Sequence, residues 1–150
     1  KGNKHRVVRA GGLPPLLKLL GSSNTSASKI NLIDGDDQFN AQRQAARAIF
    51  ALASNKENQE MIVGMGLTLL IRALSSVDTS VAQYAAGAVA NIATGDFQGS
   101  IIAAGGVGAL LQLSRSPSLE VQAQAIRGLK NLFGEQGDQN RNNKGQLTNT

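Results

Sequence analysis

The stretch VAQYAAGAVANIAT (81–94) decides the fold, because its pattern of small and apolar residues recurs 40 residues earlier and 40 residues later. The related stretches are AQRQAARAIFALAS (41–54) and VQAQAIRGLKNLFG (121–134). Matching helices at a fixed period of this size predict a helical solenoid, in which each unit buries its apolar stripe against the next. The residues expected to face the core, spaced three or four positions apart, are Ala45, Ile49, Leu52, Ala85, Val89, Ile92, Ala125, Leu129 and Leu132.

A second recurring block precedes each of these helices. The blocks are RVVRAGGLPPLLKLL (6–20), EMIVGMGLTLLIRAL (60–74) and SIIAAGGVGALLQLS (100–114). Each predicts a short apolar helical turn, a break at glycine and a second helix. In the middle block Met65 replaces the first glycine of the pair, and we expect Gly64 and Gly66 to supply the break there.

Composition sets the class of protein. The chain has 150 residues, of which 41% are hydrophobic and 3% aromatic, with no Trp, and this favours one all-α domain of closely packed helices. Cysteine is absent, which excludes disulfides, zinc-thiolate sites and cysteine nucleophiles. The longest apolar runs are too short to span a membrane, so we expect no membrane partner. The start without Met, inside the repeat pattern, predicts a fragment of a longer protein.

The repeats resemble armadillo repeats, in which a Gly-Gly-hydrophobic-Pro turn opens the second helix and Asn-Leu-Ala ends the third. The matching segments are Ala10–Pro14, Ala104–Val107, Asn91–Ala93 and Asn131–Leu132. HEAT repeats have a similar period, but the Gly-Gly turn and the Asn-Leu ending favour armadillo. The resemblance implies an all-α, right-handed superhelical solenoid of armadillo repeats at about 5–58, 59–98 and 99–135, within a domain of residues 1–135.

Two segments depart from the period. Gly12 lies 33 residues before Ala45, whereas 19 residues separate the equivalent pairs in the other repeats, so the first repeat carries an insertion at about 24–37. This insertion is either a surface loop or a segment whose Ile30, Leu32 and Ile33 dock on the solenoid or on a partner. Residues 136–150 have lost both the period and the apolar residues, which predicts a flexible polar tail.

A second face of each long helix lies at the Asn position and at the residues four and seven before it. This face carries Ala51 and Gly87 together with Gln44, Arg47, Tyr84, Asn91, Gln124, Arg127 and Asn131. In armadillo proteins this surface is a concave groove whose Asn side chains hold an extended peptide, so the resemblance implies that these last seven residues line a peptide-binding groove. A carboxamide pairs with both the N–H and the C=O of a peptide. The alternative interpretation is that Asn91 and Asn131 satisfy local backbone groups near the helix ends.

Charge indicates the kind of partner. Fifteen Lys and Arg residues against ten Asp and Glu give a net charge of +5, which favours an acidic partner. Arg47 and Arg127 would pair with acidic or phosphorylated side chains. Armadillo proteins that import nuclear cargo have Trp at the positions of Arg47, Gly87 and Arg127, so we do not expect lysine-rich cargo here. An acidic partner of the kind that catenins bind fits better.

Other functions have weaker support in the sequence. The alternative function is the binding of nucleic-acid phosphates by a basic surface. The sole histidine is His5, and no paired catalytic groups, calcium-loop spacing or phosphate loop accompany it, so we expect no enzyme, metal or cofactor. We therefore expect a protein-binding scaffold of the cytoplasm or nucleus. Self-association through the exposed apolar ends of the solenoid is a further possibility.

Overall fold

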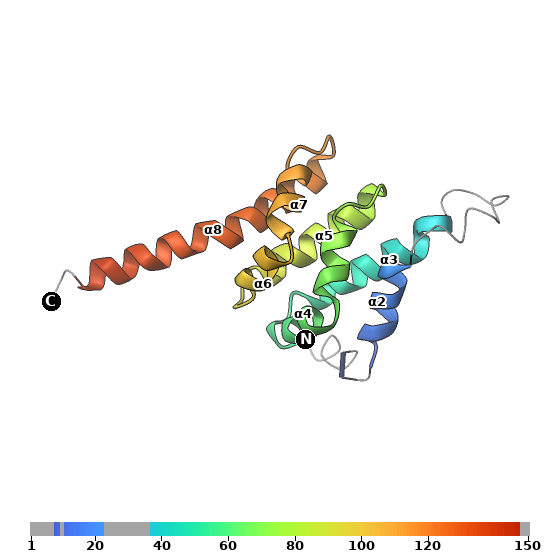
Figure 1. Cartoon of the computed structure of the whole chain (residues 1–150), viewed down its shortest axis with the longest axis horizontal. Helices are drawn as coiled ribbons and strands as arrows, with labels where there is room; N and C mark the ends of the chain where they lie inside the picture. The colour runs from blue at the N-terminus through green and yellow to red at the C-terminus, as the bar shows by residue number, and fades with distance from the viewer. Residues whose placement is uncertain (1–7, 10, 23–36, 148–150) are drawn as a thin grey trace.

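The computed structural model describes the backbone of residues 8–9, 11–22 and 37–147. Within the range 37–147 it describes the side chains of residues 39–134. The described residues fold into α2 (Leu13–Gly21), α3 (Asp37–Leu52), α4 (Lys56–Ala73), α5 (Thr79–Ile92), α6 (Gln98–Ala103), α7 (Gly106–Leu113) and α8 (Leu119–Leu147) (Figure 1). These residues contain no strand. The predicted all-helical solenoid is confirmed.

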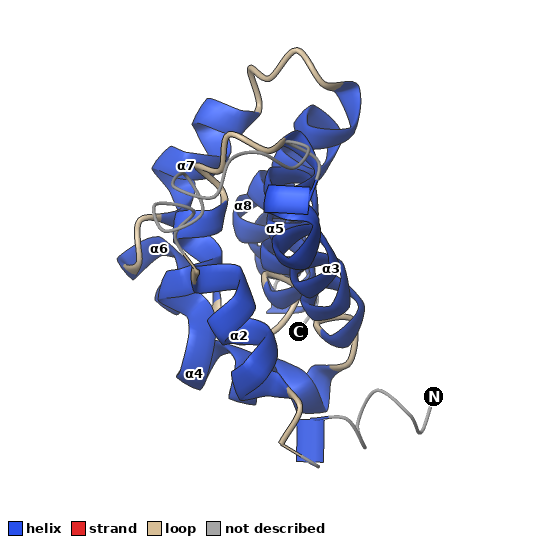
Figure 2. Cartoon of the chain, turned by 90° about the vertical axis from the view of Figure 1, so that its right-hand side faces the viewer, coloured by secondary structure: helices blue, strands red, loops and turns tan. Residues whose placement is uncertain are grey.

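The helices form two layers. Helices α3, α5 and α8 run side by side and make one layer, which we call the third-helix layer, while α2, α4, α6 and α7 make the other (Figures 1 and 2). The predicted core residues lie between the layers, where all are buried except Leu129, which is partly buried. Ala45, Ala85 and Ala125 occupy the same position in successive third helices, and their small side chains let neighbouring helices approach closely.

Short polar side chains cap the starts of α4 and α5. The Asn55 side chain accepts a hydrogen bond from the N–H of Glu57 (2.9 Å) at the start of α4, and Asp78 accepts one from Val81 (3.0 Å) at the start of α5. At the start of α2, Pro occupies the first turn, where its missing N–H has no helical partner to lose. These local signals mark where α2, α4 and α5 begin.

The expected break in the second repeat is absent. Helix α4 runs without interruption from Lys56 to Ala73, so the prediction that Gly64 and Gly66 separate two helices is wrong. The breaks of the first and third repeats have a glycine with positive φ, Gly11 (+82°) and Gly105 (+87°). Met65 occupies the equivalent position, and its Cβ disfavours that left-handed conformation, so the helix continues.

Two predictions concern the insertion at 24–37 and the tail at 136–150, which the structure describes only in part. The insertion at 24–37 lies outside the described residues except for Asp37, which begins α3, so both interpretations of it stay open. Helix α8 continues beyond the last repeat position to Leu147 (Figure 1). The backbone of the expected tail is therefore helical through that residue, and its flexibility stays a prediction.

No described helix combines the length and the apolar character needed to cross a membrane.

Candidate functional site

The seven predicted site residues all lie on the third-helix layer, but the structure brings only some of them together. Gln44 and Arg47 are exposed on α3, and the side chains of both lack a hydrogen bond or ion pair within the described part of the chain. Tyr84, Asn91, Gln124 and Arg127 are partly buried on α5 and α8. Asn131, on α8, is buried.

Arg127 is the centre of a polar cluster that joins α8 to α5. Its Nε and Nη2 donate to Gln124 Oε1 (3.0 and 2.8 Å), which fixes the guanidinium on its own helix. Across the helix boundary, Nη1 donates to Asn91 Oδ1 (2.9 Å) and Nη2 donates to the Gly87 carbonyl (3.2 Å). Each of these acceptors is neutral. Burial lowers the pKa of Arg127 from its ordinary value, which is the expected effect of removing a cation from water.

The two asparagines link successive third helices. Asn91 Nδ2 donates to the Phe50 carbonyl (3.3 Å), and Asn131 Nδ2 donates to the Ala90 carbonyl (2.9 Å). In both cases the acceptor lies 41 residues earlier, on the preceding third helix. The carbonyls that they satisfy therefore belong to the neighbouring repeat and not to the end of their own helix.

An aromatic pair occupies the first-repeat side of this surface. The Phe50 and Tyr84 rings are tilted, with centroids 6.0 Å apart. Phe50 also covers Gly87, where an added Cβ would lie 2.6 Å from the ring. Sequence reasoning missed Phe50, because it lies one position from the predicted face. The sequence contains one signal for it. Position 87 is glycine, whereas the equivalent positions of the other repeats are Arg47 and Arg127, and the large residue Phe50 accompanies this glycine.

Two glutamines that sequence reasoning also missed hold the ends of the third helices. Gln59 Nε2 donates to the carbonyls of Ala53 (2.9 Å) and Asn91 (3.1 Å). Gln98 Nε2 repeats this arrangement in the next repeat, with the carbonyls of Ala93 (3.0 Å) and Asn131 (3.2 Å). Each glutamine therefore bridges two successive third helices and fixes the backbone that carries an asparagine.

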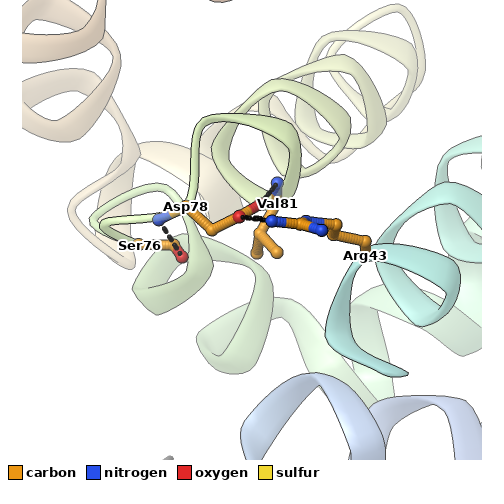
Figure 3. Close-up of polar contacts among 4 residues, drawn as sticks. All are labelled: Arg43, Ser76, Asp78 and Val81. Carbon is orange, nitrogen blue, oxygen red and sulfur yellow. Dashed lines mark hydrogen bonds and ion pairs between the residues drawn. The ribbon is translucent and has the colours of Figure 1, made fainter. Parts of the chain in front are cut away.

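An ion pair joins α3 to the start of α5 (Figure 3). Arg43 donates from Nε (3.0 Å) and Nη2 (2.7 Å) to Asp78 Oδ2. The Asp78 N–H in turn donates to Ser76 Oγ (3.2 Å). Partial burial by itself raises the pKa of Asp78, but the hydrogen bonds from Arg43, Val81 and Ser80 and the Arg43 charge outweigh it and hold this pKa below 3.8.

Comparison with known families identifies the repeat. The family described as armadillo/beta-catenin-like repeat matches residues 55–94 and 99–134. The chain belongs to the armadillo repeat family. The two matches cover the repeats that contain Tyr84, Asn91, Gln124, Arg127 and Asn131, so the Arg127 cluster lies within armadillo repeats.

Three similar solved structures are of engineered or designed proteins. A crystal structure of an engineered protein is 36% identical over 87% of this chain and 49% of its own, with a TM-score of 0.71. A designed armadillo repeat protein is 29% identical over 86% of this chain and 50% of its own, with a TM-score of 0.70. A second one, solved in complex with the peptide (KR)4, is 28% identical over 86% of this chain and 50% of its own, with a TM-score of 0.67.

The chain therefore spans about half the length of these three proteins. Comparison with curated protein sequences gave no match.

Proposed function

We propose that the third-helix layer binds an extended peptide that carries acidic side chains. The observation that carries this proposal is the Arg127 guanidinium, which is partly buried and, among the described residues, hydrogen-bonded to neutral acceptors alone. A partly desolvated cation whose described partners include no carboxylate is a favourable place for an incoming anion, because pairing supplies charge compensation that these partners do not. Arg47, exposed on the same layer, adds a second positive charge.

The asparagines support an extended main chain as the partner. Each uses one N–H of its Nδ2 for the neighbouring helix, which leaves a second N–H for a ligand carbonyl. An extended peptide presents carbonyl and N–H groups at regular intervals, and a row of carboxamides pairs with them without selecting a side chain. The armadillo fold is a binding scaffold, and one designed armadillo protein similar to this chain was solved with a peptide.

The charge of the partner is the part that an experiment must decide. The probes are fluorescently labelled peptides of alternating Glu and Ser, (ES)4, and of alternating Lys and Arg, (KR)4. We expect fluorescence anisotropy to show tighter binding of (ES)4 than of (KR)4. Arg47→Gln should weaken (ES)4 binding several-fold, because it removes an exposed charge from the layer.

Arg72→Gln is the matched control, because Arg72 is an exposed arginine on α4 in the opposite layer. It removes the same charge and should leave (ES)4 affinity within about twofold of the unsubstituted protein. Tighter binding of (KR)4, or equal losses in both variants, contradicts the proposal. A labelled single-stranded RNA completes the set: RNA binding that exceeds peptide binding and falls steeply with salt would assign the layer to nucleic acid instead.

A further inference from the structure

Asn91 and Asn131 differ in how completely their side chains are used. Asn91 is engaged at both ends, since Nδ2 donates to the Phe50 carbonyl and Oδ1 accepts from Arg127. Asn131 donates to the Ala90 carbonyl, but within the described part of the chain its Oδ1 has no hydrogen-bond donor. The difference arises from Arg127, which reaches across the helix boundary to Asn91. In the empty protein, Arg127 therefore occupies one of the two acceptor positions of the Asn91 amide oxygen, which a peptide N–H can otherwise use.

The contacts of Arg127 favour exchange of this partner. A guanidinium has five N–H donors, and the four hydrogen bonds of Arg127 leave one N–H on Nη1, beside the N–H that binds Asn91. A hydrogen bond from arginine to a carboxylate joins two opposite charges, whereas the bond to Asn91 joins the cation to a neutral amide oxygen. A carboxylate that reaches Nη1 can therefore accept from the free N–H and compete with the amide oxygen of Asn91 for the other one, while Gln124 keeps the guanidinium in place.

We propose that Arg127 is a specificity-determining residue, which releases Asn91 to the peptide main chain when an acidic side chain of the same peptide takes its place. This inference rests on the proposed function. An acidic peptide gains both the pairing with Arg127 and the freed Asn91 oxygen. A neutral peptide lacks this pairing, so Arg127 keeps one acceptor position of the Asn91 oxygen. One residue thus favours the acidic partner and penalises the neutral one.

Arg47 provides the internal comparison, because it occupies the same repeat position as Arg127, two repeats earlier. It is exposed and makes no side-chain hydrogen bond within the described residues. An acidic side chain that binds Arg47 gains charge pairing alone, since Arg47 makes no hydrogen bond to an asparagine within the described residues. Loss of Arg47 should therefore weaken acidic peptides without strengthening neutral ones.

The test compares (ES)4 with (QS)4, in which each Glu is replaced by the uncharged Gln. The unsubstituted protein should bind (ES)4 at least tenfold more tightly than (QS)4. In Arg127→Ala, (ES)4 should lose about tenfold in affinity, whereas (QS)4 should bind several-fold more tightly, because the Asn91 oxygen no longer accepts from Arg127. Arg47→Gln should weaken (ES)4 and leave (QS)4 unchanged. Circular dichroism and thermal unfolding establish that each variant is folded.

Side-chain amide resonances give a second readout that does not depend on affinity. In ¹⁵N-labelled protein without peptide, Arg127→Ala should shift the Asn91 side-chain amide signals much more than those of Asn131. Addition of (ES)4 to the unsubstituted protein should also shift the Asn91 signals. Arg127→Lys should lose the selective effect, because an ammonium lacks the planar fork that contacts Gln124 and Asn91 together.

The outcomes separate this inference from the proposed function. Equal weakening of (ES)4 and (QS)4 by Arg127→Ala, with the preference for (ES)4 retained, overturns the role of Arg127 while peptide binding stands. Failure of the unsubstituted protein to bind either peptide overturns both. A reversed response, in which (QS)4 gains and (ES)4 loses affinity, supports the release of Asn91.

Discussion

The carboxylate of Asp78 makes two kinds of contact, a helix cap and an ion pair. It caps the first turn of α5 through Val81 and pairs with Arg43 of α3, so it connects the start of one third helix to the preceding one (Figure 3). Its side chain is 8% exposed, which limits the screening that weakens surface ion pairs. A single protonation therefore removes both a charge pair and part of a helix cap.

Stability should fall in acid through Asp78. Because the pKa of Asp78 in the folded protein lies below its ordinary value of 3.8, its contribution is complete above about pH 5 and is lost as the pH falls through the folded pKa. Asp78→Asn keeps a capping residue but removes the charge, and should cost about 1–2 kcal/mol at pH 7. Urea unfolding of both proteins from pH 7 to pH 2.5 measures the difference, which should shrink below pH 4. A difference that stays constant with pH would contradict this assignment.

Single residues also mark the limit of sequence reasoning about the site. The repeat period predicted that Asn91 and Arg127 share a face, because that depends on helix geometry alone. It did not predict their hydrogen bond, which depends on the side-chain conformation of Arg127 and on the room left at Gly87, under Phe50. Gln59 and Gln98 were missed because they lie 39 residues apart, so an alignment at a period of 40 does not match them.

At the scale of the helices, a single Cβ decides whether a repeat has a break. The sequence period predicted breaks at all three glycine-containing blocks, and the structure has positive-φ glycine only at Gly11 and Gly105 among its described residues. The flanking glycines Gly64 and Gly66 did not break the helix in place of Met65. A glycine can adopt a positive φ that ends a helix, but it adopts helical dihedral angles as well. Gly66 instead allows close packing, since a Cβ there would overlap Leu17.

Two glycines in the third repeat should respond to the same substitution with opposite signs. Gly105→Ala should destabilise by about 1–2 kcal/mol, because its φ of +87° is strained for any residue with a Cβ. Gly108→Ala, within α7, should stabilise by about 0.5–1 kcal/mol through reduced entropy of the unfolded chain. An added Cβ meets no atom within 4 Å at either position, so packing does not enter the comparison. Urea unfolding measures both, and shifts of the same sign would contradict the explanation.

At the scale of the whole molecule, the third repeat exposes apolar side chains that the second repeat buries. Phe133 is 56% exposed, whereas Ala93, 40 residues earlier, is fully buried. Ile102 is 46% exposed, whereas Ile62 is fully buried. The same contrast relates Leu111 to Ile71 and Ile126 to Ala86. These positions are buried in the second repeat because the third repeat packs on it, so the outer face of α6, α7 and α8 is an unpaired repeat surface.

We expect this chain to self-associate through that face. The exposed side chains of this face are those of Ile102, Leu111, Ile126 and Phe133. They occupy the repeat positions that are buried in the second repeat, so a second copy that covers them gains buried apolar area. Static light scattering should show an apparent mass that rises with protein concentration. Ile126→Glu combined with Phe133→Glu should keep the protein monomeric, because association would then bury unpaired carboxylates.

The matched control is Leu19→Glu with Met61→Glu, which places the same charges at two exposed apolar positions on α2 and α4. Because these residues lie outside the unpaired face, association should persist in this variant although its net charge falls equally. A constant monomer mass for the unsubstituted protein would show that the exposed face does not drive association. Equal loss of association in both variants would assign the effect to net charge, since added negative charge would then suffice without regard to position.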